Sequence, residues 1–165
     1  MRPQFLLDGM LGSLTRWLRI CGYDAEYLRN ASDEELIRRA IDKRRILLTR
    51  DRLLYRKAIR AGAQAFFIKG NSDTEKLASV SRKFRLDLDP EKSRCPQCDA
   101  TLAVVEKEAV EGKVPSRTLE AYNEFWICVS CGKVYWKGSH WRNIIETVDE
   151  AMKQASAIGG SENTL

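Results

Sequence analysis

The chain has 165 residues, of which 44% are hydrophobic and 31% charged, a composition typical of a globular protein and not of a disordered one. No run approaches the roughly 18 apolar residues of a membrane span, and residues 1–4 start no signal-peptide core, so we expect a cytoplasmic protein without membrane association. Residues 1–90 contain 19 Lys and Arg against 12 Asp and Glu, whereas residues 91–165 contain 9 against 11. The basic first half favours a polyanionic partner, because Lys and Arg displace phosphate counterions; a solubilising surface is the alternative.

The first half alternates between short apolar runs and amphipathic stretches. The apolar runs, which we expect to be strands, are residues 5–8, 25–28, 46–49 and 65–68. Apolar residues at three- and four-residue steps predict helices over residues 11–21, 32–41, 53–61 and 73–84. This alternation predicts parallel βαβ units, and the continuously apolar strands predict helices on both faces of the sheet. The expected fold is therefore a three-layer α/β/α domain with a parallel sheet.

The periodicity weakens beyond residues 87–90, an Asp- and Pro-containing stretch typical of a linker. We therefore expect two parts, residues 1–90 and residues 91–165. In the second part a helix is predicted near residues 141–152, and the Gly-Gly-Ser-Glu-Asn tail is expected to fray.

Four cysteines of the second part form two Cys-x-x-Cys pairs, Cys95 with Cys98 and Cys128 with Cys131. Two intervening residues let both thiolates of one tight turn face the same ion, and two such turns complete a tetrahedron. Gly132, after the second pair, suits a turn that points amide groups at sulfur. Four thiolates leave no position for water, so we expect one structural zinc ion; unliganded thiols or a redox pair are the alternatives.

The fifth cysteine, Cys21, lies on the apolar face of the first predicted helix. We expect it to be a small core residue and not a ligand or a nucleophile.

Three acidic residues lie at the ends of expected strands or at the start of a helix. Asp8 and Asp51 follow strands, and Asp33 lies in the first turn of a capped helix. Ligands of open α/β sheets bind outside the carboxyl ends of the strands, so these carboxylates could converge on Mg²⁺ or Mn²⁺, which can drive phosphoryl displacement. The alternatives are a helix-dipole role for Asp33 and an N-cap role for Asp51. Asp8, which is followed by pliable backbone at Gly9 and Gly12, has no such simple explanation.

Several longer sequence motifs occur in both halves of the chain. In the first half they are Phe-Leu-Leu-Asp-Gly-Met-Leu-Gly (residues 5–12), Arg-Trp-Leu-Arg (16–19), Gly-Tyr-Asp (22–24) and Leu-Leu-Thr-Arg-Asp-Arg (47–52). In the second half they are Arg-Cys-Pro-Gln-Cys (94–98), Phe-Trp-Ile-Cys (125–128) and Tyr-Trp-Lys-Gly-Ser-His-Trp (135–141). This set resembles the mut-seven C-terminal RNase family over about residues 5–147.

The resemblance implies a PIN-like nuclease domain followed by a zinc ribbon, with ribonuclease activity. By position it places Asp8, Asp33 and Asp51 in the acidic metal site of PIN-like nucleases. Asp73, at the start of a helix after a strand, is a candidate fourth acid.

Arginines occur close to the expected acids. Arg52, Arg56 and Arg60 recur every four residues and predict a basic stripe beside Asp51. With other arginines they could line a groove for an RNA backbone; a solvated helix face is the alternative. These other arginines are Arg16, Arg19, Arg44, Arg45 and Arg50.

Aromatic residues gather in the second half. They are Trp126, Tyr135, Trp136 and Trp141. Bases stack on exposed rings, but a small domain also needs large side chains for its core, and we expect packing to dominate. Lys133 and Lys137 leave room for an RNA contact, and His140, the only histidine, is expected to have a hydrogen-bonded structural role.

The sequence therefore favours a metal-dependent ribonuclease, endonucleolytic, that acts on RNA phosphodiester bonds; the ribosome or tRNA are further candidate partners. A non-catalytic RNA- or ribosome-binding adaptor is the main alternative. An aspartyl phosphatase is disfavoured because Met10 stands where such enzymes need a second acid.

Overall fold

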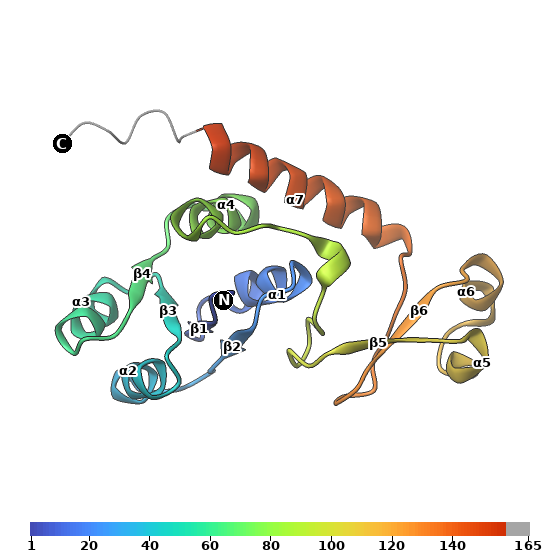
Figure 1. Ribbon diagram of the computed structural model, residues 1–165, viewed down its shortest axis with the longest axis horizontal. Helices are drawn as coiled ribbons and strands as arrows, with labels where there is room; N and C mark the ends of the chain where they lie inside the picture. Colours follow the sequence, from blue (N-terminus) through green and yellow to red (C-terminus); the bar gives the residue numbers. More distant parts are fainter. Residues whose placement is uncertain (158–165) are drawn as a thin grey trace.

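The computed structural model describes residues 1–157, so the tail that was predicted to fray lies outside the described residues. The first part of the chain forms a parallel sheet whose strands alternate with helices (Figure 1). Its strands, in the spatial order β2-β1-β3-β4, are β1 (Phe5–Leu7), β2 (Ala25–Tyr27), β3 (Ile46–Thr49) and β4 (Ala65–Phe67). Its helices are α1 (Gly12–Ile20), α2 (Asp33–Asp42), α3 (Arg52–Arg60) and α4 (Asp73–Phe84). All eight elements were predicted from the sequence.

Side-chain caps start three of these helices. Ser32 accepts a hydrogen bond from the amide of Glu35 at the start of α2, and Asp51 caps α3. At the start of α4, Ser72 and Glu75 form a reciprocal capping box. These caps satisfy amide groups that have no partner within the helix.

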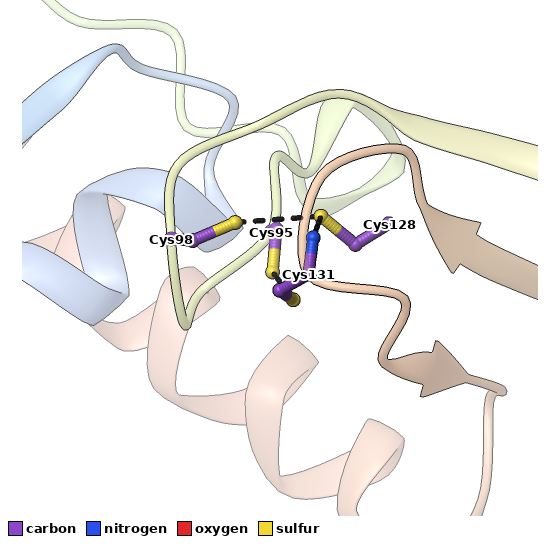
Figure 2. Close-up of side chains that lie close together, drawn as sticks. All are labelled: Cys95, Cys98, Cys128 and Cys131. Atoms are coloured by element: carbon purple, nitrogen blue, oxygen red, sulfur yellow. Dashed lines mark hydrogen bonds between the residues drawn. The ribbon is translucent and has the colours of Figure 1, made fainter.

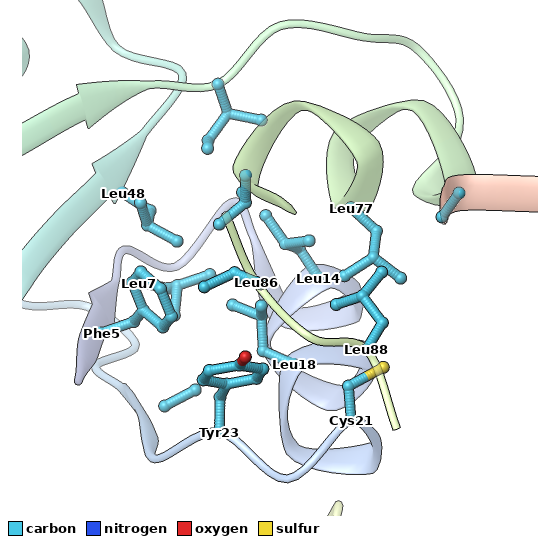
Figure 3. Close-up of a cluster of buried hydrophobic side chains, with 14 of the residues drawn as sticks. Phe5, Leu7, Leu14, Leu18, Cys21, Tyr23, Leu48, Leu77, Leu86 and Leu88 are labelled. Atoms are coloured by element: carbon cyan, nitrogen blue, oxygen red, sulfur yellow. The ribbon is translucent and has the colours of Figure 1, made fainter. Parts of the chain in front are cut away.

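Helices cover both faces of the sheet. Phe5 and Leu7 of β1 pack in the cluster that contains Leu18 of α1 and Leu77 of α4 (Figure 3). Leu6, between them, points to the opposite face and packs with α2 and α3. The predicted three-layer α/β/α fold is therefore confirmed.

The second part contains an antiparallel sheet with the order β5-β6-β7, which we call the ribbon. Its elements are β5 (Leu102–Val105), α5 (Lys107–Val110), α6 (Ser116–Ala121), β6 (Phe125–Cys128) and β7 (Val134–Tyr135). One face of its sheet packs on a small core of Val110, Val114 and Phe125. A short 3-10 helix, η1 (Pro90–Lys92), leads into it from α4.

The last helix returns to the first part of the chain. This helix, α7 (Ser139–Ala157), lies along α4 (Figure 1). Its Val148 and Ala151 are buried in the same cluster as Leu77. Although α7 follows the ribbon in sequence, it therefore completes the core of the α/β layers, and the ribbon is an insertion between α4 and α7 in the sequence.

Within residues 1–157, no helix combines the length and apolar character needed to cross a membrane.

Candidate functional site

The carboxyl ends of β1 and β3 meet at the centre of the sheet, where the strand order reverses. The chain leaves β1 toward β2 on one side, and β3 lies on the other, with Leu7 in register with Leu48. Ligands of open α/β sheets bind at such a reversal. Asp8 directly follows β1, and Thr49 is the last residue of β3.

Asp8 is buried, with 6% of its surface exposed. Its Oδ2 accepts a hydrogen bond of 2.6 Å from the Thr49 hydroxyl, and its Oδ1 accepts one of 3.1 Å from the amide of Met10. The Thr49 hydroxyl oxygen in turn accepts a bond of 3.0 Å from the amide of Asp51. Thr49 thus links the two strand-end acids. Its position two residues before Asp51 was the only sequence signal for this role.

Asp51 caps α3. Its Oδ1 accepts hydrogen bonds from the amides of Leu53, at 2.8 Å, and Leu54, at 3.2 Å. The N-cap alternative is therefore observed. This N-cap role is compatible with a place in the candidate site, because the cap holds the Asp51 carboxylate at the same end of the strands as Asp8.

Asp33 lies in the first turn of α2 and binds a lysine from the neighbouring helix. Lys57 of α3 donates a hydrogen bond of 3.0 Å to its Oδ2. This hydrogen bond, with the charges of Asp33, Glu34 and Asp51, raises the pKa of Lys57. The Lys57 ammonium group thus pairs with Asp33, and the negative charge of Asp51 also favours its protonated form.

The candidate carboxylates lie at the same end of the sheet but do not form a compact cluster. Asp73, the candidate fourth acid, accepts a hydrogen bond of 2.5 Å from Ser13 at the start of α1. Within residues 1–157, only the four cysteines form a group of three or more His, Cys, Asp or Glu whose ligand atoms all lie within 4.8 Å of one another.

Tyr27 holds the loop that follows Asp8. Its hydroxyl donates a hydrogen bond of 2.9 Å to the carbonyl of Gly9. A Cβ atom at Gly12 would lie 3.2 Å from the same hydroxyl, so glycine permits this close approach. Both glycines therefore contact Tyr27 beside the candidate site.

The basic stripe predicted on α3 is exposed. Arg52, Arg56 and Arg60 all face solvent, and the Arg52 guanidinium lies 5.2 Å from the centre of the Phe67 ring. Arg16 is exposed on α1, and Arg50 donates to the carbonyl of Gly70.

Two other arginines lie elsewhere. Arg44 and Arg45 precede β3, so they lie at the amino-terminal end of the strands, whereas Asp8 lies at the carboxyl end. The prediction that they share a groove with the acids was wrong. Arg45 instead pairs with Asp24 at 2.7 Å.

Arg19 is buried and contacts the first cysteine turn. Its guanidinium donates to the carbonyls of Ala25, at 2.9 Å, and Pro96, at 3.1 Å, and lies 3.7 Å from the Asp99 carboxylate. The expectation of a solvent-facing RNA contact is not met, because burial and these bonds occupy the side chain. Asp99 also accepts from Arg94, at 2.8 Å, so these residues dock the turn onto α1 and β2.

The four predicted cysteine ligands converge (Figure 2). The sulfur atoms of Cys95 and Cys131 lie 3.7 Å apart, and those of Cys98 and Cys128 lie 3.4 Å apart. A tetrahedral zinc ion with Zn–S bonds of about 2.3 Å places its sulfurs about 3.8 Å apart. The group could therefore bind zinc with small adjustments.

The two cysteine turns share one backbone geometry. The residue after each pair has a positive φ, 71° at Asp99 and 74° at Gly132. In each case its amide bonds the carbonyl of the first cysteine, Cys95 at 2.8 Å or Cys128 at 3.0 Å. Asp tolerates this left-handed conformation better than most residues, and here its carboxylate is needed for docking on Arg19.

Amide groups also point at sulfur in the second turn. Burial raises the pKa of the Cys128 thiol, but the amides of Cys131 and Ser130, each 3.4 Å from its sulfur, lower it more strongly, to about 6. The hydroxyl of Tyr135 lies 3.1 Å from the sulfur of Cys95. The amide contacts favour the thiolate of Cys128, the form that binds metal.

The aromatic residues of the ribbon are divided between its two faces. Trp136 packs with Phe125 in the ribbon core, with ring centres 6.4 Å apart. Trp126 and Trp141 are half-buried, and the rings of both lie close to the Lys137 ammonium group. Packing therefore explains only part of the set. His140 is exposed, and among the described residues its side chain has no hydrogen-bond partner, so its expected structural role is not observed.

Comparisons with curated proteins and with solved structures gave no match. A family match covers residues 3–148 and includes both cysteine turns, all four candidate acids and most of α7. The chain therefore belongs to the Mut7-C RNAse domain family.

Proposed function

We propose that the protein is a metal-dependent endoribonuclease whose Asp8, Asp33 and Asp51 hold Mg²⁺ or Mn²⁺. The observation that carries this proposal is the buried Asp8 carboxylate, joined to Asp51 through the Thr49 hydroxyl where the strand order reverses. Burying a carboxylate is costly, and ligands of open α/β sheets bind outside the carboxyl ends of the strands, where Asp8 lies. Membership of an RNase family adds RNA as the substrate class.

The donor chemistry fits a hard divalent cation. Carboxylate oxygens are the ligands such ions prefer, and Thr49 and the amide of Met10 fix the orientation of Asp8. Asp33 requires one change, because its Oδ2 is bonded to Lys57. Since Lys57 is a flexible, exposed side chain, a divalent ion can replace its ammonium group beside Asp33.

The other residues would position the RNA. When bound, the divalent ion supplies Lewis-acid chemistry and lowers the pKa of water for attack on phosphorus. Arg52, Arg56 and Arg60 offer the exposed guanidinium groups that a phosphate backbone binds, along a helix that starts at Asp51. Lys57, once released from Asp33, adds a further cation at the same helix.

We also propose that the four cysteines hold a structural zinc ion. Their close packing leaves no ligand position for water, so this ion would fix the ribbon and take no part in cleavage. The ribbon's own core is small, and a structural metal commonly supplies the missing folding free energy in such domains.

A non-catalytic RNA-binding adaptor is the second candidate. It is favoured by the Asp33–Lys57 pair and by the absence of a compact acidic cluster among the described residues. An adaptor would bind RNA equally well with and without Mg²⁺ and would not cut it.

Asp8→Asn distinguishes the two. Asn keeps the size of the side chain, and its oxygen can still accept from the Met10 amide while its NH2 group donates to the Thr49 hydroxyl oxygen, so the fold should persist. We expect cleavage of a labelled RNA in Mn²⁺ to fall at least about 100-fold, because losing a direct ligand should cost more than losing a residue that orients one. Asp42→Asn, an exposed acid at the far end of α2, is the matched control and should cleave normally. Equal cleavage by both variants would refute the assignment.

A further inference from the structure

One face of the ribbon sheet carries apolar and aromatic side chains that its core does not use. Strand register aligns Val104 of β5, Trp126 of β6 and Tyr135 of β7 in one row across the sheet. Side chains alternate between faces, and the neighbouring residues Phe125 and Val134 pack in the ribbon core. The row therefore lies on the other face, where Val104 is 74% exposed. We call this row, with Trp141 and the two lysines described next, the Trp126 face.

Lysines lie over the rings of this face. The Lys137 ammonium is 5.7 Å from the centre of the Trp126 ring and 4.9 Å from that of Trp141. The Lys133 ammonium is 5.7 Å from the Tyr135 ring. Lys137 is also paired with the exposed Glu91 at 2.8 Å, a bond that a phosphate group can replace.

Acidic and basic residues are also separated within the ribbon. Residues 106–124, which include α5 and α6, contain five Glu against three Lys and Arg. Residues 125–142, which supply most of the Trp126 face, contain three Lys and Arg and no Asp or Glu. A surface that combines aromatic rings with lysines matches bases and phosphates at once.

We infer that the Trp126 face binds single-stranded RNA, with bases stacked on Trp126 and Trp141 and phosphates held by Lys133 and Lys137. This inference rests on the proposed ribonuclease function, since RNA is the polyanion an RNase domain must hold. Single strands are specified because a duplex keeps its bases stacked on one another and hides their faces from flat aromatic surfaces.

The face lies apart from the acids. The first cysteine turn docks at the C-terminal end of α1, through Arg19, whereas Asp8 precedes the N-terminal end of that helix. The nine residues of α1 span about 14 Å. The Trp126 face would therefore hold a part of the strand away from the scissile phosphate.

Val104 offers a test that leaves the fold undisturbed, because its side chain is largely exposed. The probe is a fluorescein-labelled oligouridine of about twelve nucleotides, matched to the site sizes of such surfaces. Binding is measured by anisotropy in the Asp8→Asn background, without chelator, so that the RNA is not cut and zinc is not removed. We expect Val104→Glu to weaken binding about tenfold, because its carboxylate would repel the phosphates held at this face. Val104→Lys, the matched control, should bind as tightly as the parent or more tightly.

A duplex RNA of the same length gives the comparison. Its affinity should change much less than that of the single strand in Val104→Glu. Equal affinities of the two Val104 variants for the single strand, or an equal loss for duplex and single strand, would overturn the inference. Because this assay needs no cleavage, its failure leaves the nuclease proposal intact, and failure of the cleavage test leaves this assay readable.

Tryptophan fluorescence supplies a second readout. Stacked bases should quench Trp126, so oligouridine should quench Trp126→Phe less than the parent, although a phenyl ring still supports binding. Trp136→Phe, altered on the core side of the ribbon, should keep the parent's loss of signal. Undiminished quenching in Trp126→Phe would contradict stacking at this face.

Discussion

At the scale of single residues, the Asp8 carboxylate has its position fixed before any ligand binds. The Thr49 hydroxyl and the amide of Met10 each donate to one of its oxygens. Two such bonds offset the cost of burial and hold the carboxylate in one orientation. Asp33, by contrast, is partly exposed and held by a lysine. Asp8 is thus better preorganised than Asp33.

Cys21 illustrates how burial silences a thiol. It is fully buried in the main core (Figure 3), and this burial, reinforced by the charge of Asp89, raises its pKa to about 12. The thiolate is the reactive form, so after zinc removal the four other cysteines should react with a thiol reagent while Cys21 reacts only on unfolding. Thiol counting with and without denaturant measures this, and five fast thiols in the native state would contradict it.

The same group makes a pH-dependent contribution to stability. The unfolded thiol ionises near pH 9.0, whereas the folded thiol keeps its proton up to about pH 12. Above pH 9 the unfolded state therefore binds fewer protons, and the stability contributed by Cys21 should fall as pH rises through this window. In urea unfolding, Cys21→Ala should lose less stability than the parent between pH 8 and 10.

At the scale of elements, α1 connects the two candidate sites. Its N-terminal end follows the Asp8 loop, and Arg19 near its C-terminal end bonds the first cysteine turn. The bonds from Arg19 and from Arg94 hold Asp99 in its left-handed conformation against β2. Zinc binding should thus stabilise α1 as well as the ribbon.

Arg19→Met tests this coupling. Met keeps the packing of the stem but leaves the carbonyls of Ala25 and Pro96 without the guanidinium donor and removes one ion pair of Asp99, so unfolding should cost about 2–3 kcal/mol less. Zinc affinity, measured by competition with a chromogenic chelator, should fall about tenfold, as for residues that orient metal ligands. Arg16→Met, exposed on the same helix, should change stability by less than about 0.5 kcal/mol. Equal effects of the two substitutions would refute the coupling.

At the scale of the whole molecule, local patterns predicted the α/β layers and the cysteine cluster well. Periodicity located α1 to α4 and their strands, and the spacing of the Cys pairs located the turns, because both depend on residues close in sequence. Long-range packing was not predictable in this way. The burial of Val148 and Ala151 against α4 joins segments about seventy residues apart, which the sequence pattern of α7 alone does not reveal.

The candidate site shows the same division. Asp8 and Asp51 lie at the same end of the sheet because they follow parallel strands, and the sequence predicted this position. The roles of Thr49 and Lys57 depend on side-chain contacts between different elements. The sequence pattern does not distinguish Arg19 from its exposed neighbour Arg16, because the burial of Arg19 depends on its bonds to Ala25 and to the distant turn at Pro96.

The central claim is that a hard divalent ion binds between β1 and β3. A crystal of the zinc-loaded protein soaked in Mn²⁺ tests it most directly, with the zinc signal at the four cysteines as an internal control. We predict manganese anomalous density in contact with the carboxylates of Asp8 and Asp51, with Lys57 displaced from Asp33. Manganese density only elsewhere, or an unchanged Asp33–Lys57 pair beside an empty edge of the sheet, would contradict the proposed site.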